Sequence, residues 1–201
     1  MSAAHVEVNR VQFGQVYMWS LVTAGAAIVL VSIFILPYST LDASFVFLCL
    51  MVMASSLVAI KIPRVSGRIT VADTFVFLTL LLYGGPAAIV VSALGGVAAT
   101  LIISKRPRTI LFNSAILATS TFFTVIVLYW RFGSPVNVMS KEFTAKFFMV
   151  ICVMALVQYI ANTTLIAIEK ANKIKESAWY TWRTYYLWTS LTYFAGASAA
   201  G

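Results

Sequence analysis

Charged side chains are scarce in this chain of 201 residues. Asp, Glu, Lys and Arg together make up 10% of the residues, and hydrophobic residues make up 61%. Soluble domains contain about 25% and about 45–50% of these two classes. A single soluble core cannot bury this apolar excess, so the sequence predicts a protein whose surroundings are mainly lipid.

Side chains that commonly perform catalysis or bind metals are also few. The chain has six acidic residues, one histidine and two cysteines. His5 lies in the polar N-terminal tail, and the sequence has no GxSxG, HExxH or Walker pattern. Cys49 and Cys152 lie in apolar runs and are interpreted as small core residues. We therefore expect no enzymatic activity, no cofactor and no metal site.

Long apolar runs are abundant, and turn-forming residues separate them. A bilayer core of about 30 Å requires about 20 helical residues, and six segments come close: 16–36, 41–60, 71–83, 86–104, 109–130 and 143–168. The third spans only about 20 Å at 1.5 Å per residue, so we expect it to lie inside the bundle. The predicted fold is an all-α polytopic membrane protein with a six-helix transmembrane bundle over residues 16–168.

The cations are divided unevenly between the connecting segments. If alternate loops face alternate sides, one side receives three cations, Arg131, Lys141 and Lys146. The other side receives eleven, in the tail, in two loops and after the sixth segment: Arg10, Lys61, Arg64, Arg68, Lys105, Arg106, Arg108, Lys170, Lys173, Lys175 and Arg183. Cytoplasmic loops carry the excess of Lys and Arg. The net charge of +8 therefore predicts an orientation and contact with anionic headgroups, rather than nucleic-acid binding.

This orientation divides the chain into four parts. Residues 1–15 form a cytoplasmic tail, and the bundle follows at 16–168. Residues 169–186 form a cytoplasmic linker whose Trp179, Trp182 and Arg183 suit a helix on the membrane surface. Such a helix would anchor the bundle or couple it to a further domain. Residues 187–201 begin another apolar helix, truncated or re-entrant, so we expect the chain to be a piece of a longer protein.

Asp73 lies at the start of the third segment, close to the basic loop. The Thr70-x-x-Asp73 spacing resembles a helix-capping arrangement. Arg64 and Arg68 lie near enough in sequence to pair with the carboxylate. The alternative is a protonatable acid within the membrane.

Small and polar side chains also occur inside the predicted spans. Ala88, Ser92, Gly96 and Thr100 recur every four residues, as expected for close helix packing or for dimerisation. Gln158 and Asn162 lie one turn apart on the sixth segment. They suit hydrogen bonds between helices, or the binding of a ligand.

Aromatic side chains gather at the ends of the spans opposite the basic loops. They suit either an interfacial belt or an apolar pocket for a flat ligand, and the sequence does not separate the two. The candidate ligand-binding residues are these aromatic side chains, the amides on the sixth segment and one acid that could lie at the edge of such a pocket. They are Tyr38, Asp42, Tyr83, Phe122, Phe123, Tyr129, Trp130, Phe147, Gln158 and Asn162.

Several motifs resemble the N-terminal membrane region of bacterial signalling proteins that carry a GGDEF or HD-GYP domain. They are "IPRVSG" at 62–67, "DTFVFLTLLLYGGPAA" at 73–88, "RPRTILFN" at 106–113 and "YFAGASAAG" at 193–201. Such regions are in turn similar in fold to the S components of energy-coupling-factor (ECF) vitamin transporters. The short third segment and the cytoplasmic termini fit that arrangement. The resemblance implies a location in the bacterial inner membrane.

The resemblance also implies a function. A small molecule similar to a vitamin would bind near the outer face, and a cytoplasmic GGDEF or HD-GYP effector would translate binding into cyclic di-GMP signalling. Arg64, Arg68, Asp73, Trp179, Trp182 and Arg183 are the candidate coupling residues. Two alternatives remain open: an S component of a vitamin transporter, and a scaffold that senses lipid or forms a homodimer. S components dock through Ala-x-x-x-Ala on the first helix, where this chain has only Ser20-x-x-x-Ala24 and Thr23-x-x-x-Ala27.

Overall fold

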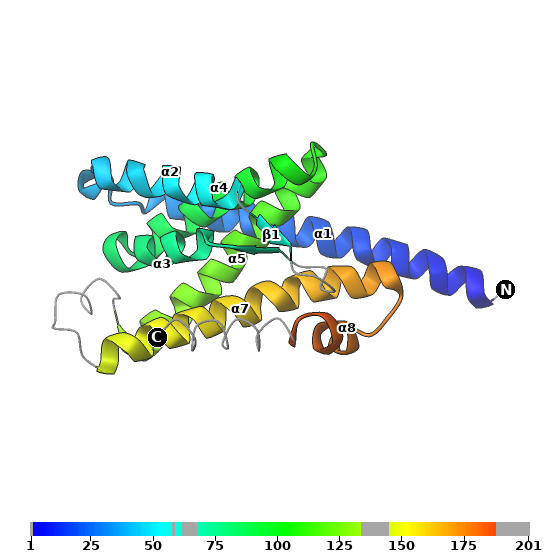
Figure 1. The fold of residues 1–201 in the computed structure, drawn as a ribbon. Helices are drawn as coiled ribbons and strands as arrows, with labels where there is room; N and C mark the ends of the chain where they lie inside the picture. The colour runs from blue at the N-terminus through cyan, green and yellow to red at the C-terminus, as the bar shows by residue number, and fades with distance from the viewer. Residues whose placement is uncertain (1, 58, 62–67, 134–144, 188–201) are drawn as a thin grey trace.

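The computed structural model describes residues 2–57, 59–61, 68–133 and 145–187, and side chains over 12–57, 71–133 and 147–187. The described elements are, in chain order, α1 (Ser2–Phe34), the 3-10 turn η1 (Tyr38–Thr40), α2 (Ala43–Leu57), β1 (Ala59–Lys61), β2 (Arg68–Thr70), α3 (Ala72–Tyr83), α4 (Gly85–Ile103), α5 (Pro107–Phe132), α7 (Ala145–Ile174) and α8 (Ala178–Tyr185). Figure 1 shows an elongated bundle, with the N-terminus, the α4–α5 junction and α8 toward one end.

Each of the six apolar segments corresponds to a helix, but the helices differ in length. Four are long and apolar enough to cross a membrane: Gln12–Phe34, Gly85–Ile103, Pro107–Phe132 and Phe147–Ile174. The predicted short third segment corresponds to α3, which has 12 residues. The second segment is shorter than predicted, because α2 has 15 residues and the chain then enters strand β1.

The basic segment after α2 contains a small antiparallel strand pair. Ala59 pairs with Thr70, Ile60 with Ile69 and Lys61 with Arg68. The fold is therefore all-helical apart from one short hairpin of two three-residue strands, and the predicted all-α class is confirmed. Two factors favour strand here: β-branched residues near Ile60 and Ile69, and the position of the segment between two helix ends.

Helix α5 is the central element of the helix packing, because α4 and α1 both approach its first half closely. A side-chain carbon added at Gly96 of α4 would lie 2.7 Å from the Ser114 Cα, and one at Gly25 of α1 would lie 2.7 Å from the Ala115 Cα. Ser114 Oγ donates to the carbonyl oxygen of Ala93 at 2.9 Å. These contacts require residues without bulk, as the small-residue pattern predicts.

The four-residue stripe on α4 lies inside the subunit. Ala88, Ser92 and Thr100 are buried, and Asn113 Nδ2 of α5 donates to Thr100 Oγ1 at 3.0 Å. The prediction that this stripe packs within the molecule is confirmed, and the stripe is not available as a dimer face.

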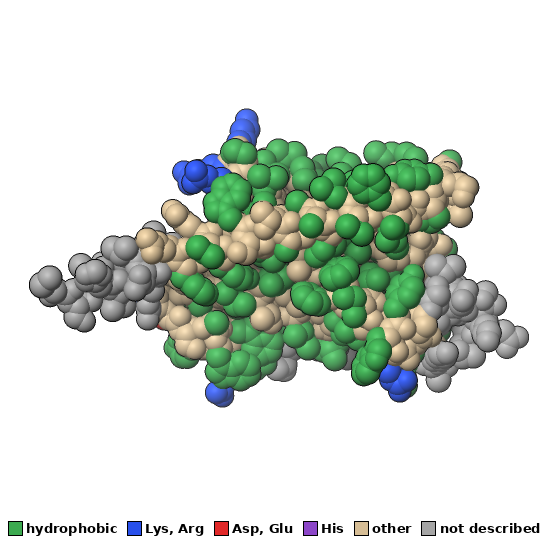
Figure 2. All heavy atoms as spheres, turned by 180° about the vertical axis from the view of Figure 1, so that it is seen from behind, with side chains coloured by type: hydrophobic (Ala, Val, Ile, Leu, Met, Phe, Trp, Pro, Cys, Tyr) green, Lys and Arg blue, Asp and Glu red, His purple; other side chains and the backbone are tan. Residues whose placement is uncertain are grey.

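The exterior of the bundle is apolar. Hydrophobic side chains cover the face in Figure 2, and Lys and Arg side chains stand toward its ends. Phe34 and Trp130 expose 83% and 84% of their surface. A soluble protein of this size rarely exposes so continuous an apolar surface. Together with the four long apolar helices, this surface indicates a multi-pass membrane protein.

Candidate functional site

Asp42 and Tyr83, two predicted ligand-binding residues, bind each other. The Tyr83 hydroxyl donates to the Asp42 carboxylate, which also accepts from the Phe45 backbone N–H at 3.0 Å. The hydrogen bond from Tyr83, followed by that from Phe45, lowers the pKa of Asp42 below its ordinary value. The ring of Tyr83 packs edge-on against Phe45, with centroids 5.2 Å apart. This pair ties the start of α2 to the end of α3.

Of the predicted aromatic residues in the described part of the chain, only Tyr83 and Phe147 pack against the same hydrophobic cluster. Phe123, Tyr129 and Trp130 are exposed on α5, an arrangement typical of an interfacial belt. Phe122 and Phe147 instead pack against two separate hydrophobic clusters.

Tyr38 is exposed and donates its hydroxyl hydrogen to the carbonyl oxygen of Ile33 at 2.7 Å. It therefore contacts its own chain segment at the end of α1. Residues 134–144, which connect the fifth and sixth predicted segments, lie outside the described residues.

Gln158 occupies a buried polar cluster between α5 and α7. Its Nε2 donates to Ser120 Oγ at 3.3 Å and to Thr121 Oγ1 at 3.2 Å, and its Oε1 accepts from Thr124 Oγ1 at 2.9 Å. The amide is thus satisfied by α5 hydroxyls, and its role is to hold the two helices together.

Asn162 lies one turn further along α7 and differs from Gln158. Its Oδ1 is buried and has no hydrogen-bond partner among the described residues. The neighbouring Thr163 is occupied: its Oγ1 donates to the carbonyl oxygen of Tyr159 at 2.7 Å and accepts from Trp182 Nε1 at 3.0 Å.

The predicted capping arrangement at Thr70 is wrong. Helix α3 begins at Ala72, and its N-cap residue is Val71 rather than Thr70; the Val71 side chain forms no capping hydrogen bond. Asp73 lies in the first turn, where a carboxylate still favours the positive end of the helix dipole. Arg64 lies outside the described residues, and only the backbone of Arg68 is described, as part of β2.

The predicted surface helix after the sixth segment is α8. The rings of Trp179 and Trp182 stack with centroids 5.6 Å apart. Trp179 is 68% exposed and Arg183 is also exposed, whereas Trp182 is partly buried against α7 through its bond to Thr163.

Two further contacts hold the end of α8 on α7. The Tyr159 hydroxyl donates to the carbonyl oxygen of Tyr186, and Lys170 Nζ lies 3.3 Å from the centroid of the Tyr185 ring. Burial, with smaller contributions from Glu169 and Tyr159, raises the pKa of Tyr186 to about 12. Tyr186 therefore stays neutral at physiological pH and adds no charge to this junction.

A cavity of about 440 Å³ lies between α1, α5 and α7, at the end of the bundle that carries the basic segments. Its lining comprises Gly14, Gln15, Tyr17, Met18, Arg108, Thr109, Phe112, Glu169, Asn172, Lys173 and Lys175. The volume falls in the range of small-molecule sites, about 300–1,000 Å³. None of the predicted ligand-binding residues lines it.

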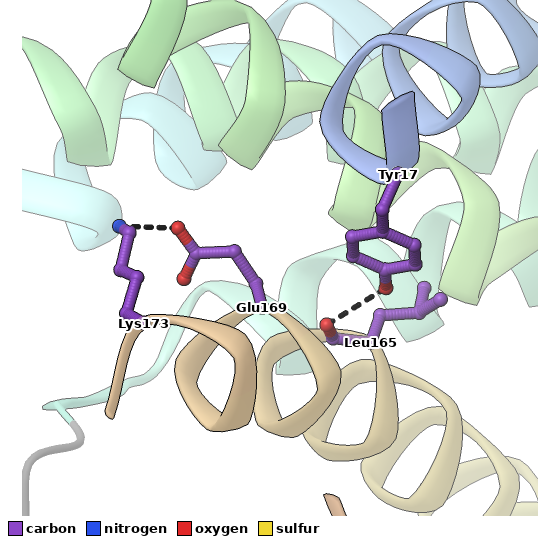
Figure 3. Close-up of polar contacts among 4 residues, drawn as sticks. All are labelled: Tyr17, Leu165, Glu169 and Lys173. Atoms are coloured by element: carbon purple, nitrogen blue, oxygen red, sulfur yellow. Dashed lines mark hydrogen bonds and ion pairs between the residues drawn. The ribbon is translucent and has the colours of Figure 1, made fainter. Parts of the chain in front are cut away.

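The cavity has a polar side on α7 and a contact with α1 at its edge. Tyr17 points from α1 toward α7 and donates to the carbonyl oxygen of Leu165 at 2.9 Å (Figure 3). Glu169 and Lys173, one and two turns beyond Leu165, form an ion pair on the same helix (Figure 3). Asn172 lies over Gly14, where a side chain on α1 would collide with it.

Sequence reasoning placed the basic segments near 105–108 and 170–175 on one side of the membrane, and the cavity brings Arg108 and Lys173 to the same end. It did not predict a cavity there.

Cys152, interpreted as a core residue, is exposed on α7, and Cys49 is partly buried. The small size of a cysteine does not reveal which face of a helix it occupies.

The chain matches no protein-family model, and no match was found among curated proteins or solved structures. The candidate site is therefore assigned from its own geometry.

Proposed function

We propose that the chain is a ligand-binding sensor module of the bacterial inner membrane, with six helices across the bundle and both ends in the cytoplasm. A small molecule similar to a vitamin would bind toward the outer end. A cytoplasmic effector of the GGDEF or HD-GYP type, following residue 201, would respond to it. This type of effector is proposed because the sequence motifs resemble the membrane region of bacterial signalling proteins that carry such a domain.

The attachment of α8 to α7 is the observation that carries this proposal. Hydrogen bonds at Thr163 and Tyr186 and the cation–π contact of Lys170 join the two helices over three turns of α7. A shift of α7 relative to α5 would therefore move α8 with it. Because α8 follows α7 in the chain, it would pass that shift to a domain that follows it.

The test uses the full chain fused after Gly201 to a diguanylate cyclase domain and reconstituted in nanodiscs. Cyclic di-GMP formation is measured with and without each member of a panel of water-soluble vitamins. We expect one ligand to change the rate. An unchanged rate with every ligand would contradict the sensor function.

Trp182→Phe should weaken this response, because phenylalanine keeps the ring and loses the hydrogen bond to Thr163. A bond worth about 1 kcal/mol shifts a two-state equilibrium about fivefold. Trp179→Phe is the matched control. Trp179 is exposed, and the phenylalanine that replaces it keeps an aromatic ring for stacking on Trp182. Equal effects of the two substitutions would refute a coupling role for the Trp182–Thr163 contact.

A second function, the S component of a vitamin transporter, is favoured by one surface of α1. Ser20, Thr23, Ala24 and Ala27 are exposed there, so another helix can approach closely. Co-purification of the chain with a transport subunit and an ATPase pair would support this alternative over the sensor.

A further inference from the structure

The cavity between α1, α5 and α7 combines basic groups with an apolar wall. Arg108, Lys173 and Lys175 line it together with a single carboxylate, Glu169, which forms an ion pair with Lys173. Among the lining residues, positive charge therefore exceeds negative charge. Such a lining favours an anionic ligand over a neutral or cationic one.

The remaining lining is suited to the apolar part of an amphiphile. Tyr17, Met18 and Phe112 form this part of the wall. Phe112 is buried in a cluster that includes Leu21, with Tyr17 and Met18 packed against it. A small inorganic anion would leave this wall without a partner, whereas a ligand with carbon atoms beside its anionic group would cover it.

The position of the cavity matches the depth of lipid headgroups. It opens beside the first turns of two long apolar helices, Gln12–Phe34 and Pro107–Phe132, and the last turn of a third, Phe147–Ile174. The ends of membrane-spanning helices lie where the hydrocarbon region meets the headgroups. Basic pockets between such helices bind anionic headgroups.

We propose that this cavity binds the phosphate of an anionic phospholipid, with its glycerol and first acyl carbons against Tyr17, Met18 and Phe112. The phosphate would accept hydrogen bonds from Arg108 and Lys175, with Asn172 and Gln15 as further polar contacts. Because Arg108 belongs to α5 and Lys175 follows α7, a bound headgroup would join the two helices. This lipid site goes beyond the proposed sensor function and does not depend on it.

The test is thermal unfolding of the purified full chain in neutral detergent, with added phosphatidylglycerol. We expect phosphatidylglycerol to raise the unfolding temperature in a saturable manner. Phosphatidylcholine of the same chain length, glycerol 3-phosphate and inorganic phosphate serve as comparisons and should have little effect.

Arg108→Gln and Lys175→Gln should each raise the phosphatidylglycerol midpoint about tenfold, the effect of losing one charge-assisted hydrogen bond. Lys105→Gln is the matched control: Lys105 is exposed in the same basic segment but does not line the cavity. It should leave the midpoint unchanged. The unfolding temperature without added lipid reports whether each variant is folded.

Three outcomes would overturn the proposal. The first is the absence of any shift with phosphatidylglycerol. The second is an equal loss in Lys105→Gln, which would indicate general surface attraction. The third is an equal shift with glycerol 3-phosphate or inorganic phosphate, which would assign the cavity to a soluble anion. None of these results involves an effector, so each is distinguishable from failure of the sensor function.

Discussion

Gly96→Val is expected to destabilise the bundle by about 3 kcal/mol, the upper part of the range for overpacked cores. A carbon added at Gly96 would lie 2.7 Å from the Cα of Ser114 and 3.1 Å from the carbonyl oxygen of Asn113. Both atoms belong to the backbone of α5, so no rotation of a side chain relieves the contact. The two helices must separate, which also disturbs the Ser114–Ala93 hydrogen bond. Reversible unfolding in mixed micelles measures the loss.

A comparison of two adjacent glycines provides the control. Gly95→Ala and Gly96→Ala gain the same helix propensity, about 1 kcal/mol relative to glycine. At Gly95 the new methyl would meet side-chain atoms of Val52 and Ser56 rather than backbone. We expect Gly96→Ala to be the less stable variant. Equal stability of the two variants would show that the backbone of α5 does not lie against Gly96.

Gln158→Leu is expected to lower the free energy of unfolding by about 2 kcal/mol. Side-chain hydrogen bonds between membrane helices contribute about 0.6 kcal/mol on average, and Gln158 forms three of them. The loss is limited because two of the hydroxyls also donate to backbone carbonyl oxygens: Ser120 to Leu117, and Thr124 to Ser120.

Two measurements distinguish the loss of this hydrogen-bond cluster from the general effect of replacing an amide by an apolar side chain. Gln12→Leu makes the same chemical change at an exposed position of α1 and should be nearly neutral. Gln158→Leu and Thr124→Val should be non-additive when combined, because they remove the same hydrogen bond. Additive losses would show that the contact contributes no energy.

The helices could be predicted from the sequence because each long apolar run is bounded by turn-forming residues. Pro107 begins α5 and Gly133 follows its end with a positive φ of 79°. The end of α2 could not be placed in this way. Residues 59 and 60 continue the apolar run, and the pairing of Ile60 with Ile69, which no periodicity within α2 reveals, places them in a strand instead of the helix.

The candidate site was less predictable than the fold. Tyr17, Arg108 and Lys173 lie far apart in the sequence and meet only because α1, α5 and α7 share one end of the bundle. The uneven distribution of cations predicted that end, but a cavity depends on the distances between helices. The sequence left open whether the aromatic residues form an interfacial belt or line a pocket, because the exposure of Phe123 and Trp130 depends on which side of α5 faces its neighbours.

Small residues allow α1 and α4 to approach α5, and a polar cluster joins α5 to α7. The α7–α8 unit and the basic cavity then lie at the same end of the bundle. The proposed sensor function requires this end to face the cytoplasm, because an effector domain following α8 must lie there.

The sidedness of the bundle is tested most directly by labelling single cysteines in intact cells, after Cys49→Ala and Cys152→Ala. Ser39 in η1 and Lys105 between α4 and α5 are exposed in connections that alternate sides along the chain. With a membrane-impermeant maleimide, Ser39→Cys should be labelled in intact cells and Lys105→Cys only after lysis. Labelling of Lys105→Cys in intact cells, with Ser39→Cys protected, would contradict the account.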